Sequence, residues 1–204
     1  YTPRLDEESQ YLWYTTKNGH PYRIPAIARM SNNELLAVID YRTCGDDIGM
    51  GEVDIVGRIG TPDGKQWSDE MMIADGDGNS SAYPYFGCGF GDAAVVADSE
   101  SGKVVIMCVS GKVRYINANA TTHPCVARIV SEDYGRHWTV QNVTSQFLGT
   151  ESSLLPGSYA LFFGSGRIVQ SKKVKVAGSD YYRLYAAILS RGSNCNGNYV
   201  VYSD

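Results

Sequence analysis

Two arginines and three aspartates in the first hundred residues are the side chains best suited to chemistry on an anionic ligand. Arg23 and Arg42 carry guanidinium groups, which present paired donors to both oxygens of a carboxylate. Asp46, Asp47 and Asp92 carry carboxyl groups, which accept hydrogen bonds and transfer protons. Each has a structural alternative, because a strand arginine can pair with a surface acid and an aspartate can cap a turn.

Short β-strands are the elements that must position these residues. Val- and Ile-rich runs of five to seven residues predict strands at Leu35–Ile39, Val53–Ile59, Ala93–Ala97, Val104–Val109, Val126–Val130 and Leu184–Leu189. Clusters of Gly, Asn, Asp and Ser separate the runs and are typical of hairpin turns. Only residues 145–155 are suited to a short helix. The pattern therefore predicts an all-β protein.

One turn pattern occurs twice in the chain. Ser131–Trp138 reads Ser-x-Asp-x-Gly-x-x-Trp, and Thr61–Trp67, which starts 70 residues earlier, has the same pattern with one residue fewer. Ser203 lies at the position where a third copy would begin. The hydroxyl and carboxylate can bind turn amides, the glycine supplies positive φ, and the tryptophan packs beneath the loop. We therefore predict structural roles for Asp63 and Asp133.

Charge and composition exclude several classes of protein. The chain has 18 basic and 22 acidic side chains, a net charge of −4 and no long run of either sign, which argues against nucleic acid as a partner. No stretch approaches the roughly 20 apolar residues that a membrane span requires. The five cysteines and three histidines show no zinc-binding spacing, so we expect neither a metal nor a cofactor.

A longer series of motifs resembles the sialidase (neuraminidase) family, in particular the bacterial exo-α-sialidases. Tyr22–Pro25 reads Tyr-Arg-Ile-Pro and is similar to the Phe/Tyr-Arg-Ile-Pro motif near the start of sialidase domains. It is followed in family order by Asp40–Arg42, by the strand Val53–Val56 and by Gly91–Val96. The repeated turn resembles the Asp box of the same family. The resemblance extends from about residue 20 to the end of the chain.

The resemblance implies a fold and a division of the chain. Sialidases are six-bladed β-propellers, so about three blades are expected in this chain. Residues 20–204 would form the N-terminal half of the catalytic propeller, and residues 1–19 would be a lead-in segment or linker. The remaining half of the propeller would then be a necessary partner.

The resemblance also implies roles for the residues named at the outset. Arg23, with its neighbour Ile24, would bind the carboxylate of a sialic acid as one of three arginines. Arg42 would lie near that carboxylate and the 4-hydroxyl, and Asp92 would bind sugar hydroxyls or the amide side of the ring. Asp47 would act as general acid and base from a glycine-rich, flexible loop. Asp46 stays an alternative, because the spacing of Asp47 from Arg42 is one residue shorter than usual.

The expected activity is the hydrolysis of terminal α-linked sialic acids from glycans or glycoproteins, with retention. The family uses a tyrosine nucleophile activated by a glutamate. By family order both residues and the other two arginines lie outside this chain, and the protein would be secreted, periplasmic or on the cell surface. Two alternatives remain: an inactive propeller that binds sialic acid, and an Asp-box propeller that acts on a neutral glycan or binds proteins.

Overall fold

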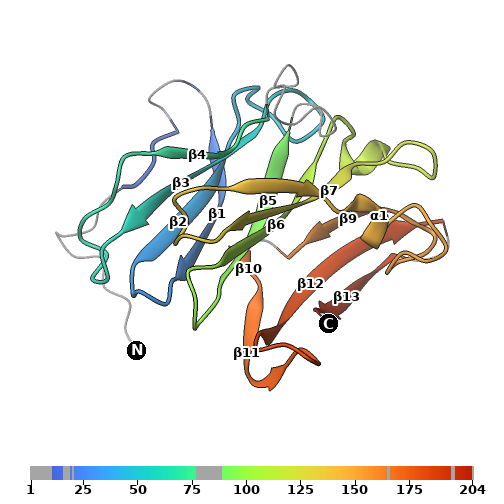
Figure 1. The fold of residues 1–204 in the computed structure, drawn as a ribbon. Helices are drawn as coiled ribbons and strands as arrows, with labels where there is room; N and C mark the ends of the chain where they lie inside the picture. The colour runs from blue at the N-terminus through green and yellow to red at the C-terminus, as the bar shows by residue number, and fades with distance from the viewer. Residues whose placement is uncertain are drawn as a thin grey trace, which may run out of the picture.

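The computed structural model describes residues 11–15, 19, 21–76, 89–164, 166–193 and 196–203. These residues form an all-β fold of three sheets, as the sequence pattern predicts (Figure 1). Most of the lead-in segment expected at 1–19 lies outside the described residues. In the described part of the chain, every helix is too short and too polar to cross a membrane.

The first sheet is an antiparallel meander in the order β1-β2-β3-β4. Its strands are β1 (Tyr22–Arg29), β2 (Leu35–Tyr41), β3 (Asp54–Gly60) and β4 (Met71–Ala74). The predicted strands at 35–39 and 53–59 correspond to β2 and β3, which carry most of the buried residues of this sheet.

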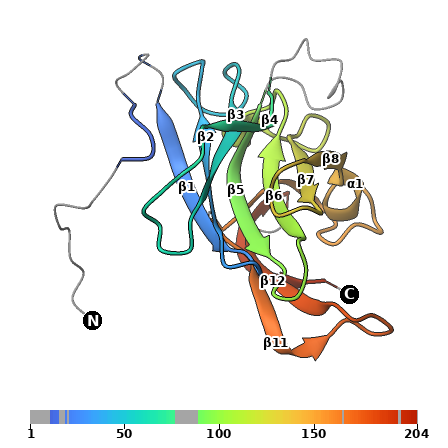
Figure 2. The ribbon, with the colours of Figure 1, turned by 60° about the vertical axis from the view of Figure 1, so that its left-hand side comes forward.

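The second sheet repeats this meander and gains one strand from later in the chain. It contains β5 (Phe90–Ala97), β6 (Val104–Ser110), β7 (Cys125–Ser131) and β8 (Thr139–Asn142). A two-residue strand, β10 (Gly166–Arg167), pairs in parallel with β5. The inner strands β1 and β5 of the first two sheets lie side by side (Figure 2).

The third sheet has an interrupted inner edge. β9 (Ser158–Phe163) and β11 (Val169–Lys175) pair with different parts of β12 (Tyr182–Gly192), whose other edge pairs with β13 (Asn196–Tyr202). Between them the chain leaves as β10 to join the second sheet, so the two sheets are interlocked. The helices among the residues that the structure describes are η1 (Tyr115–Asn117) and α1 (Thr144–Phe147), and α1 overlaps the segment at 145–155 where the sequence allows a helix.

Two apolar cores lie between successive sheets. The core between the first and second sheets includes the fully buried residues Leu36, Val38, Ile55, Phe90 and Ile106. The core between the second and third sheets includes Ala94, Leu161, Phe163 and Ile188. Each large apolar side chain contributes about 1.5–3 kcal/mol when fully buried. The sheets therefore stabilise one another face to face.

The repeated turns occupy equivalent positions in the first two sheets. One joins β3 to β4, where Thr61 Oγ1 donates to Asp63 at 2.5 Å. The other joins β7 to β8, where Ser131 Oγ donates to Asp133 at 2.8 Å. Gly64 and Gly135 have φ values of +72° and +76°, which a glycine adopts without strain. Both aspartates thus stabilise turns, which lie at the end of the sheets where β2 begins.

Candidate functional site

The predicted site residues converge at one end of the first two sheets. Arg42 follows β2, and its Nη1 lies 3.0 Å from Oδ1 of Asp47, in the loop that leads to β3. The other terminal nitrogen of Arg42 lies 4.0 Å from Asp92 on β5. Arg23 on β1 is exposed, and its charge acts on the Asp92 carboxyl. Four residues that are separated in the sequence therefore form one cluster of alternating charge.

Bulges in the two inner strands deform the backbone at this cluster. The pairing of β1 shifts register between Arg23 and Ala26, and that of β5 shifts between Gly91 and Ala94. Ile24 and Asp92 lie within these bulges and have φ values of 58° and 57°. Such values are uncommon for residues other than glycine and are strained for β-branched isoleucine. Strain of this kind is concentrated at functional sites. Because β5 begins at Phe90 and its register shifts after Gly91, Asp92 lies in a bulge within the strand and not at its start.

Asp40 is a further member of the cluster for which the sequence pattern predicted no role. Its side chain is fully buried and accepts a hydrogen bond from Arg42 Nη2 at 3.1 Å. It also accepts from the backbone N–H of Asp92, at 3.1 Å and 3.3 Å to its two oxygens. The available signal was one polar residue at the end of the apolar run of β2. Asp40 therefore connects the first sheet to the bulge of the second.

Burial and like charge control the protonation of this cluster. Burial, followed by the nearby Asp92, raises the pKa of Asp40 to about 7, although Arg42 and the Asp92 N–H act in the opposite direction. Burial, followed by Asp47, also raises the pKa of Asp92, against the lowering effects of Arg42 and Arg23. Asp40 and Asp92 are therefore protonated at a higher pH than ordinary carboxyl groups.

The loop that carries Asp47 is more firmly held than its glycine content suggests. Cys44 N donates to Glu52 O at 3.2 Å, and Met50 N donates to Asp47 O at 3.0 Å. Ile48 is buried in a small apolar cluster with Val53, Val109 and the partly buried Phe162.

The two adjacent aspartates of this loop have different contacts. Asp46 accepts a hydrogen bond from the Asp47 N–H at 2.8 Å. Asp47 pairs with Arg42, while its side chain remains 54% exposed. Both aspartates are exposed, and Asp47 is the member of the pair that contacts the cluster.

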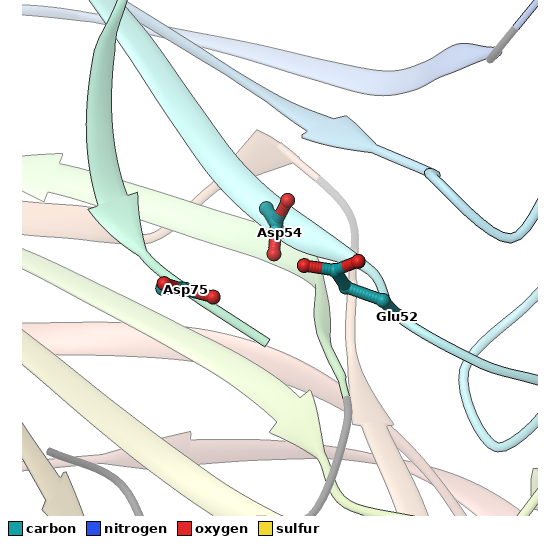
Figure 3. A group of neighbouring side chains, drawn as sticks. All are labelled: Glu52, Asp54 and Asp75. Atoms are coloured by element: carbon teal, nitrogen blue, oxygen red, sulfur yellow. The ribbon is translucent and has the colours of Figure 1, made fainter. Parts of the chain in front are cut away.

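A group of three carboxylates lies near this site. Oxygens of Glu52, Asp54 and Asp75 lie within 4.8 Å of one another (Figure 3), and hard cations such as Ca²⁺ prefer ligands of this kind. The chain itself supplies donors to two of them. Thr43 Oγ1 donates to Glu52 at 2.9 Å, and Gly76 N donates to Asp54 at 2.7 Å. The spacing of cysteines and histidines carries no information about a group of carboxylates, so it did not predict this one. Its hydrogen bonds fasten the start of β3 to the segments beside it.

Comparison with known proteins identifies a relative in sequence. No family model matches the chain. A curated sialidase from Micromonospora viridifaciens is 26% identical over 169 residues, which is 79% of this chain and 24% of that protein. The chain thus spans about a quarter of the length of this relative.

Solved structures share the fold over most of the chain. A Hadza microbial sialidase is 21% identical with a TM-score of 0.70, over 90% of this chain and 35% of that one. A leech intramolecular trans-sialidase is 13% identical with a TM-score of 0.72, over 98% of this chain and 44% of that one. The intramolecular trans-sialidase from Ruminococcus gnavus is 13% identical with a TM-score of 0.68, over 95% and 60%. The chain therefore shares its fold with these sialidases and trans-sialidases, and the curated relative in sequence is likewise a sialidase.

Proposed function

We propose that the protein containing this chain hydrolyses terminal α-linked sialic acids from glycoconjugates. The observation that carries the proposal is the convergence of Arg23, Arg42, Asp47 and Asp92 at one end of β1 and β5. A sialic acid has a carboxylate on its anomeric carbon, and arginines are the residues that bind this group best. An aspartate within reach supplies the proton that a leaving glycosidic oxygen requires.

The environments of these residues support different tasks. Arg23 is exposed and is proposed to bind the sialic acid carboxylate, with Ile24 beside it. Arg42 is buried between acidic partners and is proposed to act near the carboxylate and the 4-hydroxyl. Asp92 has a raised pKa and is proposed to bind the ring substituents, where a protonated carboxyl can donate a hydrogen bond. Asp47 is proposed as the general acid and base.

The three sheets are proposed to be three blades of a six-bladed propeller, residues 20–204 forming its N-terminal half. The two repeated turns are proposed to be Asp boxes. The tyrosine nucleophile, its glutamate and two further arginines would then come from the rest of the domain, and the reaction would retain configuration. A secreted, periplasmic or cell-surface location fits glycoconjugate substrates.

A pair of substrates in the full-length protein tests this function. We expect hydrolysis of both sialyllactose and a fluorogenic aryl sialoside, and no hydrolysis of the methyl ester of either substrate. Binding without turnover would indicate a sialic-acid-binding propeller. Cleavage that does not depend on the carboxylate would indicate an enzyme for neutral glycans.

Matched variants of the two adjacent aspartates test the assigned acid. Asp47→Asn should abolish turnover of sialyllactose and spare the aryl sialoside, because a good leaving group needs little protonation. Asp46→Asn should retain turnover of both substrates. The opposite result would transfer the role of acid to Asp46.

A further inference from the structure

The connection from β6 to β7 contains a segment that lies between the loop carrying Asp47 and the third sheet. This segment, residues 111–118, follows β6 and includes η1. Gly49 packs against its backbone so closely that a Cβ on Gly49 would lie 2.5 Å from Arg114 N and 2.8 Å from the carbonyl carbon of Val113. Gly49 also has a φ of +87°, which other residues rarely adopt. The Asp47 loop and the 111–118 segment therefore meet backbone to backbone.

Arg191 on β12 holds the other side of this segment. Its Nη1 donates to Ile116 O at 3.2 Å, and its Nη2 donates to Ala118 O at 3.2 Å and to Tyr115 O. The guanidinium lies over two rings, 5.0 Å from the centre of Tyr115 and 5.3 Å from that of Tyr159. Hydrogen bonds from a charged donor are stronger than neutral ones, and the ring contacts add to them. One side chain of the third sheet thus binds three carbonyl groups within four consecutive residues of this segment.

A second set of contacts connects the same two regions. The ring of Tyr115 meets the ring of Phe162 edge to face, with centroids 5.4 Å apart. Phe162 packs against the small apolar cluster that contains Ile48. Ile48 and Gly49 directly follow Asp47, so both sets of contacts end next to the proposed acid.

We infer that Arg191 is a positioning residue for the Asp47 loop and acts through the 111–118 segment. The inference rests on the proposed function, because it concerns the acid of that reaction. Arg191 fixes the carbonyls of Tyr115, Ile116 and Ala118 and thereby the surface on which Gly49 rests. Loss of this support leaves the Asp47 carboxyl less well placed for proton transfer, and small displacements of such a group slow the reaction strongly.

The kinetic test compares substrates that differ in their need for an acid. In the full-length protein, we expect Arg191→Met to lower kcat/KM for sialyllactose by roughly tenfold. The value for the fluorogenic aryl sialoside should change by less than about twofold, since its leaving group departs without protonation. Arg191→Lys should restore part of the loss, because an ammonium can bind one carbonyl but lacks the planar donor set.

Arg183→Met is the matched control. Arg183 lies on the same strand and also stacks on a tyrosine, with its guanidinium 4.5 Å from the ring centre of Tyr202. It lies near the opposite end of β12 from Arg191. Both substrates should keep their wild-type kcat/KM in this variant. A selective loss with sialyllactose in Arg183→Met would overturn the specific role of Arg191.

Hydrogen exchange provides a readout that does not require activity. Peptides covering residues 43–52 should exchange faster in Arg191→Met than in the wild type or in Arg183→Met.

If Arg191→Met fails to fold, Gly49→Ala separates the two loops from the other side and should give the same selective kinetic loss. Equal losses for both substrates, or unchanged kinetics and exchange, would overturn the inference. A wild-type protein that cleaves neither sialoside would instead refute the proposed function, while faster exchange would still support the role of Arg191.

Discussion

Two carboxylates join the first sheet to the second, one at each end of the strands. At the site end, Asp40 is fully buried and accepts the Asp92 N–H of β5. At the turn end, Glu34 binds the guanidinium of Arg136, with its two oxygens 3.1 Å and 2.9 Å from Nη2. Both links join residues that are far apart in the sequence. Only the first binds a backbone group, the N–H of Asp92, whereas the second binds a side chain.

The two links differ in their exposure to solvent, and the pKa values of their carboxyl groups are shifted in opposite directions. Burial raises the pKa of Asp40 to about 7. Partial burial has a similar but weaker effect on Glu34, and hydrogen bonds from Arg136 and Asn32 outweigh it and hold its pKa below the usual value. The exposed link is an ion pair that joins two side chains at the surface. The buried link sets the conformation of Asp92 and is the more vulnerable to change.

Removal of the buried carboxylate should have the largest effect. Asp40→Ala leaves Arg42 with one partner fewer and the Asp92 N–H unsatisfied, and we expect a loss of about 3 kcal/mol in the free energy of unfolding. Asp40→Asn keeps an oxygen for the Asp92 N–H and should lose less. Urea unfolding of both variants measures the difference. Equal stability of Asp40→Ala and wild type would show that the link is dispensable.

Crowding of the same carboxylate should have the next largest effect. A Cβ on Gly91 would lie 2.8 Å from Asp40 Oδ2 and 2.8 Å from Ile48 Cδ1. Gly91→Ala should therefore destabilise the protein by roughly 1–3 kcal/mol, as overpacking does. Gly164→Ala is the control, because its new Cβ would meet Ala187 at an ordinary 3.4 Å. Urea unfolding should separate the two variants, and similar midpoints would argue against close packing at Gly91.

The pH dependence of stability should differ between the links. The folded pKa of Asp40 is about 7, above the unfolded value of roughly 3.9, so the folded state binds this proton more tightly. Stability should therefore fall as the pH rises from about 4 to about 7, by at most about 1.4 kcal/mol per pH unit from this group. Urea unfolding at three pH values should show a flatter profile for Asp40→Asn. Glu34 acts with the opposite sign, since its contribution is lost as the pH falls below its unfolded pKa of roughly 4.3. Identical profiles for wild type and Asp40→Asn would contradict the raised pKa.

The exposed link should have the smallest effect. Glu34→Gln removes a pair whose side chains are 29% and 45% exposed, and such pairs contribute about 0–1 kcal/mol. A double-mutant cycle with Arg136→Ala measures the coupling directly. A coupling as large as the effect of Asp40→Ala would remove the contrast between the two ends.

The sequence predicted the central strands of each sheet better than the edge strands. Strands β2, β3, β5, β6, β7 and β12 contain the predicted apolar runs, because their side chains face the cores. The short strand β8 and the lysine-rich β11 have mostly exposed side chains, so no apolar pattern marks them.

The candidate site shows the same limit. Motifs located Arg23, Arg42 and Asp92, whose convergence the structure then describes. The link from Asp40 to Asp92 spans 52 residues and depends on how two sheets pack, which no local pattern encodes. Arg191 likewise acts on carbonyls more than 70 residues earlier in the chain.

The pairing of β10 with β5 of the second sheet also has a consequence for how the chain folds during synthesis. The edge of β5 opposite β6 is paired only when Gly166 and Arg167 reach Ala94 and Val95, some 70 residues after β5 leaves the ribosome. Until then that edge presents open backbone donors and acceptors to any neighbouring strand. Nascent chains that stall within this interval are therefore the ones we expect to need a chaperone.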